Sequence, residues 1–272
     1  MTLQPMLVGA VAYDQKVVPI WEGIRDHFRG SAIEMDVVWF SNYEAQVAAL
    51  LAGWIDVAWN TNLAYVRVHR ATDAECRALA MRDTDVGFRT LLIGRAGELG
   101  RLPDLEGRRL ALGSADSVQA AIMPVYYLRR EGLAPGDDLE LTRFDSDVGK
   151  HGDTGRSERE ALQAVLGGDA DAAAVGAASW DLLVRAGEVP PARLAPFWTS
   201  PPYNHCNFTA LPSLQTDRAG AWTAQLMAMD WDKPEDRRLL ELEGLRAWIA
   251  PELDGYTDVF DAVEEQGIAA GW

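Results

Sequence analysis

The sequence predicts an α/β protein with two doubly wound α/β domains joined by a hinge of two chain crossings. Three observations carry this prediction: short apolar strands alternate with amphipathic helices, the alternation occurs in two separate blocks, and Gly/Pro-rich segments stand between the blocks. With 272 residues and 48% hydrophobic content, the chain exceeds the usual size of one domain and can form two cores.

The first block begins with a short apolar strand and continues as a regular alternation. The spacing of its apolar residues predicts strands over 7–12, 36–40, 54–59 and 89–95, and helices over 17–28, 43–51 and 62–70. Ser41-Asn42 and Asn60-Thr61 stand at the start of two of these helices, where short polar side chains act as N-caps. The alternation predicts a parallel sheet with helices on both faces.

The second block repeats this order. Its pattern predicts strands over 110–112, 139–144 and 171–175, and helices after residue 117, over 157–166 and around 180–186. The Gly-x-x-Asp elements Gly53–Asp56 and Gly168–Asp171 occupy the same helix-to-strand position in the two blocks. This shared context favours an internal repeat over a coincidence between two glycine-capped helices.

We expect the chain to cross between domains at two segments that contain turn-forming residues, Gly94–Pro103 and Thr199–Pro202. Residues 203–210 are predicted to be extended and to return to the first domain, where the remaining amphipathic helices pack. We therefore expect a discontinuous first domain of residues 1–95 plus 199–272 and a second domain of residues 96–198.

The turn Gly113–Ser117 is the strongest candidate for a ligand-binding element. It joins the apolar strand 110–112 to a helix, Gly113 permits a tight turn, and Ser114, Asp116 and Ser117 are all good N-caps. A helix N-terminus reached in this way presents unpaired N–H groups and a positive dipole end, which favour a carboxylate, phosphate or sulfonate. The alternative is an ordinary capped helix with no ligand.

The composition excludes several classes of partner. The formal net charge of -16 argues against nucleic acids and anionic membranes, since both bind clustered Lys and Arg. No apolar run approaches the roughly 20 residues of a membrane-spanning helix, so we expect no membrane insertion. Cys76 and Cys206 are far apart and form no CxxC motif, so the sequence indicates no disulfide framework or zinc site. We expect no cofactor and no metal.

Four local stretches resemble a known family. They are residues 9–14 (Gly-Ala-Val-Ala-Tyr-Asp), residues 53–59, the turn 113–117, and His151 together with residues 161–171. In these stretches the chain resembles the phosphonate-binding (PhnD-like) branch of the type II periplasmic-binding proteins. The resemblance implies the type II periplasmic-binding-protein fold, with a ligand in the cleft between the domains and an oxyanion held by the serine-rich turn.

The resemblance also implies which side chains contact the ligand, and the charge pattern adds others. Lys16 stands at a helix start, where its charge opposes the dipole unless it reaches an anion. Asp116 replaces a small hydroxyl residue of the family, and its charge beside a fully ionised phosphonate is costly, which favours a carboxylate or a zwitterion. The ligand-binding residues that we expect are Tyr13, Lys16, Tyr43, Asn60, Asn62, Ser114, Asp116, Ser117, His151, Tyr203 and His205.

Two classes of function stay open. One is a solute-binding protein for a small anionic metabolite (a carboxylate, a phosphonate-like compound or a zwitterion), related to ABC transporters although a transporter partner is not specified. The alternative is a cytosolic enzyme on the same fold, a lyase, decarboxylase or related biosynthetic enzyme, with Lys16, His151 or Cys206 as catalytic residues. Because Met1-Thr2 is followed by no basic segment, we expect a cytoplasmic location, or a periplasmic one if a leader was removed.

His205 and Cys206 stand next to each other in the segment that we expect to be extended. Alternation along a strand sends neighbouring side chains to opposite faces, so at most one of the two is expected to face the cleft. For Cys206 the role of a small buried hydrophobic residue is favoured. His151, in contrast, lies in a glycine-rich loop, where a contact with the ligand and a position on the surface are the two alternatives.

Overall fold

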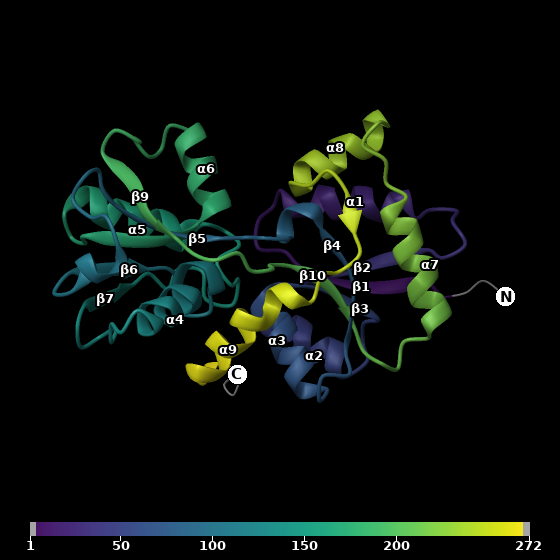
Figure 1. Cartoon of the computed structure of the whole chain (residues 1–272). Coiled ribbons are helices and arrows are strands. Elements are labelled where there is room, and N and C mark those ends of the chain that lie inside the picture. Colours follow the sequence, from purple (N-terminus) through teal and green to yellow (C-terminus); the bar gives the residue numbers. More distant parts are fainter. Residues whose placement is uncertain (1–3, 269–272) are drawn as a thin grey trace. The chain divides into compact units, whose positions relative to one another are not determined.

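A computed structural model describes residues 4–268 and divides them into two compact units. The described part of the first unit consists of residues 4–87 and 204–257, and that of the second consists of residues 88–203 and 258–268. Each unit contains one β-sheet with helices packed against it (Figure 1). None of the described helices is both long and apolar enough to cross a membrane.

The first unit has a six-stranded sheet with the order β11-β4-β10-β3-β1-β2. Its strands are β1 (Met6–Val11), β2 (Met35–Phe40), β3 (Val57–Asn60), β4 (Arg77–Arg82), β10 (Asn207–Ala210) and β11 (Trp248–Ile249). Its helices are α1 (Val17–His27), α2 (Tyr43–Leu51), α3 (Asn62–Ala71), α7 (Thr216–Met227) and α8 (Pro234–Glu243), with short 3-10 turns at Asp83–Asp85 and Asp254–Tyr256. β1 is parallel to β2 and β3, whereas β10 is antiparallel to β3 and β4.

Aromatic side chains form the centre of the first core. Phe208 on β10 is fully buried, and its ring lies 4.6 Å from that of Trp59, 4.9 Å from that of Trp222 and 5.3 Å from that of Trp248, measured between centroids. Large rings of this kind bury much apolar surface and favour tilted and edge-to-face contacts. The returning strand β10 is therefore held in the sheet by packing as well as by its hydrogen bonds.

The second unit has a five-stranded sheet with the order β7-β6-β8-β5-β9. Its strands are β5 (Thr90–Arg95), β6 (Arg109–Leu112), β7 (Glu140–Arg143), β8 (Ala172–Gly176) and β9 (Leu194–Thr199). Its helical segments are a 3-10 turn (Leu102–Leu105), a π-turn (Val118–Ile122), α4 (Met123–Arg130), α5 (Arg156–Gly167), α6 (Ala177–Arg185) and most of α9 (Thr257–Glu265). β6 is parallel to β7 and β8, and β5 is antiparallel to β8 and β9.

The predicted α/β fold class is confirmed, but the chain passes between the units at other positions than we expected. β5, assigned above to the first domain, pairs with β8 and β9 in the second sheet. The chain leaves the first unit after Gly87 and returns to it at Asn204, outside the segments 94–103 and 199–202. An apolar pattern predicts that a strand is buried, but it does not predict which sheet the strand joins. Because β5 belongs to the second sheet, residues 94–103 also lie within the second unit.

The C-terminal helix also differs from the expectation. Residues 258–265 of α9 belong to the second unit, where Asp258 accepts a hydrogen bond of 2.7 Å from the Tyr127 hydroxyl on α4. The Gln266 side chain adds a hydrogen bond of 2.9 Å to the carbonyl of Ile122. The apolar stripe of this helix predicts a buried face, but it does not identify the unit that covers that face.

The internal repeat occupies equivalent positions in the two sheets. Asp56 precedes β3, and its carboxylate accepts a hydrogen bond of 2.8 Å from the N–H of Leu7 on β1. Asp171 precedes β8, and its carboxylate accepts a hydrogen bond of 2.9 Å from the N–H of Arg109 on β6. In each case the aspartate N–H also donates to the carbonyl of the same residue, at 2.8 Å. The two aspartates therefore fix how two neighbouring parallel strands begin.

Substitution Asp171→Asn is expected to destabilise the second unit by about 1.5–3 kcal/mol at neutral pH, the usual cost of weakened hydrogen bonds to a charged group. The hydrogen bond from the Arg109 guanidinium lowers the pKa of Asp171 below its ordinary value. A carboxyl with a lowered folded pKa stabilises the fold above its unfolded pKa, and this contribution is lost as the pH falls through the folded pKa. Urea unfolding between pH 7 and pH 2 should therefore show a smaller acid-induced loss in the variant.

The matched control is Asp181→Asn, which removes an exposed carboxylate on α6 of the same unit. Exposed ion pairs contribute little, so this variant should follow the wild-type pH profile. If Asp181→Asn and Asp171→Asn changed the profile equally, the proposed role of Asp171 at the strand start would be wrong.

Candidate functional site

The turn Gly113–Ser117 connects β6 to the helical segment in front of α4, as the sequence predicts. Ser117 is the N-cap, and its Oγ accepts a hydrogen bond of 3.2 Å from the N–H of Ala120. A Cβ at Gly113 would lie 2.7 Å from the Cβ of Ala120, so the close approach of turn and helix requires glycine here. The first helical turn is a π-turn, a geometry that occurs often at functional sites.

Donors remain available at this helix N-terminus. The N–H groups of Val118 and Gln119 make no hydrogen bond to residues 4–268. Ser117 uses its oxygen as an acceptor, so its O–H proton is still available for a ligand. Ser114 differs, because its Oγ accepts from the N–H of Asp147 at 3.0 Å and lies 3.4 Å from the carbonyl of Phe144. Its hydroxyl is thus engaged in holding the loop.

The loop 145–155 lies along this turn through three successive contacts. The Asp145 carboxylate accepts from the N–H of Ala115 at 2.9 Å, and the second contact is the one from Asp147 to Ser114. The third is a hydrogen bond of 2.5 Å from the N–H of Gly149 to the carboxylate of Asp116. Turn and loop therefore form one hydrogen-bonded element.

This element places His151 beside Asp116. The Nε2 atom of His151 lies 4.0 Å from Oδ2 of Asp116, and the two residues are only 1% and 8% exposed. His151 has a positive φ of 53°, which is uncommon for a residue other than glycine and is a feature of strained functional loops. The alternative of an exposed surface position for His151 is therefore wrong.

The first unit has a buried amide of its own at the carboxyl end of β3. Asn60 is fully buried, and its Oδ1 accepts a hydrogen bond of 3.0 Å from Nε2 of Gln46. The Nδ2 atom of Asn60 has no hydrogen-bond partner among the residues that the structure describes. Buried polar atoms nearly always have a partner, so an unpaired donor here indicates a contact for a ligand or for water. The side chain of Asn62 instead connects the start of α3 to the segment before β10, because its Nδ2 donates to the carbonyl of Asn204 at 3.3 Å.

Of the remaining residues predicted for the site, Tyr13, Lys16 and Tyr43 belong to the first unit and Tyr203 belongs to the second. Tyr13 is half-buried and packs against the first core, and Tyr43 is buried at the start of α2. Lys16 is exposed at the start of α1, where its N–H donates to Asp14. Tyr203 is buried in the second unit, its hydroxyl lies 2.8 Å from that of Thr90, and burial raises its pKa.

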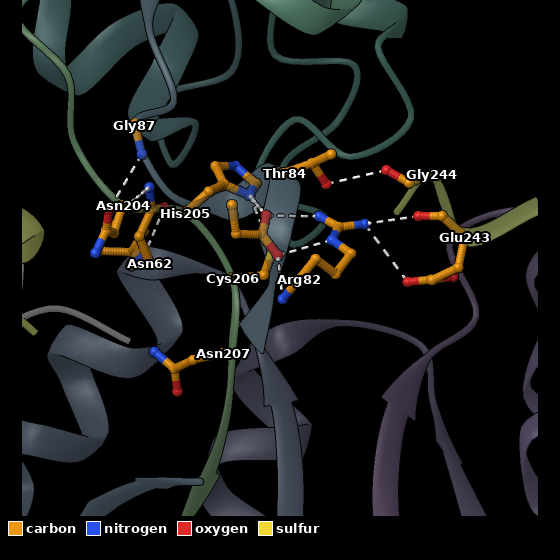
Figure 2. Close-up of polar contacts among 12 residues, drawn as sticks. Asn62, Arg82, Thr84, Gly87, Asn204, His205, Cys206, Asn207, Glu243 and Gly244 are labelled. Carbon is orange, nitrogen blue, oxygen red and sulfur yellow. Dashed lines mark hydrogen bonds and ion pairs between the residues drawn. The ribbon is translucent and has the colours of Figure 1, made fainter. Parts of the chain in front are cut away.

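His205 and Cys206 form a second cluster that the sequence did not predict. The Sγ of Cys206 lies 2.9 Å from Nδ1 of the neighbouring His205, both labelled in Figure 2. The same nitrogen lies 3.5 Å from Oδ1 of Asp85. The expectation that the two side chains point to opposite faces is wrong for a local reason. β10 begins only at Asn207, so strand alternation does not apply to His205 and Cys206.

Arg82 connects this cluster to its surroundings. Its guanidinium donates to both carboxylate oxygens of Asp85, at 2.7 and 2.8 Å. It also approaches the carboxylate of Glu243 at 3.5 Å (Figure 2). Burial raises the pKa of Asp85, but the charge of Arg82 and the hydrogen bonds from His205 and Arg82 outweigh it and lower that pKa to about 2. Asp85 is therefore ionised at any physiological pH. Neither Asp85 nor Arg82 stands in a recognisable motif, so their place in this cluster was not predictable from the sequence.

Comparison with known proteins identifies the family. Residues 11–256 match the family described as the ABC transporter, phosphonate, periplasmic substrate-binding protein. The chain belongs to this family. The PhnD-like resemblance predicted from the sequence is thus confirmed.

Individual relatives are distant in sequence and similar in fold. The chain is 22% identical over 238 residues, which cover 84% of it and 77% of the relative, to a probable ABC transporter phosphite-binding protein, PhnD1 of Prochlorococcus marinus (strain MIT 9301). The structure of that PhnD1 with methylphosphonate has a TM-score of 0.75 at 19% identity and covers 96% of this chain and 98% of its own. The sulphonate-binding protein SsuA of Escherichia coli has a TM-score of 0.66 at 14% identity, covering 99% and 94%. These similarities establish the type II periplasmic-binding-protein fold.

The comparisons also bear on the two alternatives left open by the sequence. The matched family and the relatives named here are solute-binding proteins of transporters, so the enzyme alternative has no support. The matched family is described as periplasmic, which favours the periplasmic over the cytoplasmic expectation.

Gly152→Ala is expected to disrupt the contact between turn and loop. Gly152 has a φ of +86°, and a Cβ there would lie 2.5 Å from Oγ of Ser117 and 2.7 Å from Nε2 of Gln119. Gly168 is a matched control, because it has a φ of +88° and nothing within 4 Å of a Cβ. Gly168→Ala should lose about 1–2 kcal/mol for the left-handed backbone alone. Gly152→Ala should lose a further 1–3 kcal/mol, roughly, for the clash.

Urea unfolding of the two glycine variants measures this difference. Equal losses of stability would contradict the packing of Ser117 and Gln119 against Gly152.

Proposed function

We propose that this protein is a periplasmic solute-binding protein that holds a small anion at the turn Gly113–Ser117 and delivers it to an ABC transporter. The observation that carries the proposal is the set of donors at this helix N-terminus: the N–H groups of Val118 and Gln119 and the hydroxyl of Ser117. Backbone N–H groups and the helix dipole together favour an anion. Family membership supports the same class of ligand, because the description of the matched family names phosphonate, a small anion.

Local donors, and not the overall charge, decide whether an anion binds. The chain carries a net charge of -16, but charges are screened over about 8 Å at physiological ionic strength. A buried turn with unpaired N–H groups therefore attracts an anion at short range. The imidazole of His151, in the same unit as the turn, is a further proposed contact.

Asp116 narrows the class of anion. Its buried carboxylate belongs to the same turn and already accepts the N–H of Gly149. A fully ionised oxygen of a ligand next to this carboxylate would be repelled, whereas an oxygen that carries a proton would donate a hydrogen bond to it. We therefore propose that the preferred anion retains a proton, as hydrogen phosphonate and hydrogen phosphite do and as a sulfonate does not.

Ser117→Ala should weaken binding about ten- to a hundredfold, the cost of one hydrogen bond to a charged group. Isothermal titration with methylphosphonate, phosphite, acetate and methanesulfonate identifies the best ligand of the panel for the comparison. Ser114→Ala should affect affinity less and thermal stability more, because its hydroxyl holds the loop. Ser146→Ala is the control, since Ser146 lies in the neighbouring loop and donates to Glu160. An unchanged dissociation constant in Ser117→Ala would refute the proposed anion site.

Asp116→Asn should reduce the discrimination between protonated and fully ionised anions. Its amide keeps an acceptor for the N–H of Gly149 and offers an N–H₂ group to an ionised oxygen. The measured quantity is the ratio of the dissociation constants for methanesulfonate and methylphosphonate, which should fall at least about tenfold if one unfavourable contact of about 1.4 kcal/mol is removed. Asp145→Asn removes an exposed carboxylate beside the same turn and should leave the ratio unchanged. A ratio that is the same in Asp116→Asn and wild type would exclude this role of Asp116.

A further inference from the structure

Three different metal-ligating groups meet in the first unit, on elements that do not include the turn Gly113–Ser117. They are the carboxylate of Asp85, the imidazole of His205 and the thiol of Cys206, and one donor atom of each lies within 4.8 Å of the other two. The three residues are 1%, 5% and 2% exposed. Oxygen, nitrogen and sulfur donors in one buried cluster are the set that zinc prefers in proteins.

The spacing of the donors is close to that of a tetrahedral site. Zinc-ligand distances of about 2.0–2.3 Å place neighbouring donors roughly 3.3–3.6 Å apart. The distance from Nδ1 of His205 to Oδ1 of Asp85 is 3.5 Å and already fits. The distance from the same nitrogen to Sγ of Cys206 is 2.9 Å and would lengthen by roughly 0.7 Å, a small rotation of the cysteine side chain.

The charges of the cluster also balance with a divalent cation. Asp85 and Glu243 each carry one negative charge, and Arg82 carries one positive charge between them. Coordination replaces the thiol proton of Cys206 by a sulfur-metal bond and releases the proton to solvent. The thiolate, two carboxylates, one guanidinium and one divalent cation then sum to zero, which is favourable in a buried site.

The backbone holds two of the three ligands in place before any ion binds. The N–H of His205 donates to the carbonyl of Asp85 at 2.9 Å, although the residues are 120 positions apart in sequence. The N–H of Gly87 donates to the side chain of Asn204 at 3.3 Å beside this contact (Figure 2). The hydrogen bonds from Arg82 orient the Asp85 carboxylate, as outer-shell partners of metal ligands do.

We propose that Asp85, His205 and Cys206 form a binding site for a zinc-like divalent cation. This inference does not depend on the proposed anion site, because the metal-ligating residues lie in other segments of the chain and bind a cation. The site binds the ion through Oδ1, Nδ1 and Sγ and ties the loop before β10 to the end of β4.

Cobalt provides the direct test, because tetrahedral Co²⁺ absorbs in the visible range and a bound thiolate adds a sulfur-to-cobalt charge-transfer band. The full chain, dialysed against a chelator and then against metal-free buffer, is incubated with Co²⁺ until the absorbance is constant. One equivalent of Co²⁺ per chain with both bands, displaced by Zn²⁺, supports the site. No stoichiometric binding, or binding without the thiolate band, overturns it.

Variants separate this cluster from similar groups elsewhere in the chain. Cys206→Ser and His205→Gln should weaken metal binding at least about 100-fold, the upper end of the loss seen when a supporting partner is removed. Cys76→Ser removes the other buried thiol, and His27→Gln removes a histidine that pairs with Asp236 at 3.4 Å and has no adjacent cysteine. Both controls should bind Co²⁺ like wild type. A sulfur-to-cobalt charge-transfer band that survives Cys206→Ser, or that is lost in Cys76→Ser, overturns the proposal.

A measurement on unmodified protein guards against variants that do not fold. The cadmium-113 resonance of the loaded wild type should lie between the positions of all-oxygen and all-sulfur sites, as expected for one sulfur with nitrogen and oxygen ligands. A resonance at the all-oxygen position would overturn the proposal regardless of how the variants behave.

Discussion

The two aspartates at the strand starts are the constraint on which the rest of the structure depends. Asp56 and Asp171 each accept the N–H of the neighbouring strand and donate to its carbonyl, so the relative register of two adjacent parallel strands is fixed at their amino ends. A shift by one residue would turn every side chain of a strand to the other face of the sheet. Asn60 is the last residue of β3 and the turn Gly113–Ser117 directly follows β6, so the register of each sheet sets the position of one of these two elements.

Much of the fold follows from local patterns in the sequence. The helices, the capping of α2 by Asn42 and the turn after β6 rest on interactions between residues close in sequence, and the strands are visible as short apolar runs. The repeated Gly-x-x-Asp element was visible for the same reason. The membership of β5 in the second sheet and the docking of α9 were not predictable in this way, because they depend on which buried surfaces meet after the chain has folded.

In the candidate site, too, local features were predictable from the sequence and contacts between distant segments were not. The residue types of the turn predicted donors for an anion, but they did not distinguish the two serines, since only the loop 145–155 determines that Ser114 is engaged. The cluster around Asp85 joins segments far apart in sequence, and the contact between Gln46 and Asn60 joins two consecutive elements, α2 and β3. For Cys206 the sequence suggested a small buried hydrophobic residue. Its burial agrees with that suggestion, but its contact with His205 gives it a polar role.

The paired contacts at Gly87 and Asn204 have a consequence for the architecture of the chain. The N–H of Gly87 donates to the side chain of Asn204, so the segment 88–203 begins and ends at one place on the first unit. It has the form of a domain inserted into a loop of another domain, and such insertions are tolerated where the two ends lie close together. The six strands of the first sheet all lie outside this segment. A gene rearrangement that exchanges the inserted domain would therefore replace the proposed anion-binding turn and leave the sheet of the first unit unchanged.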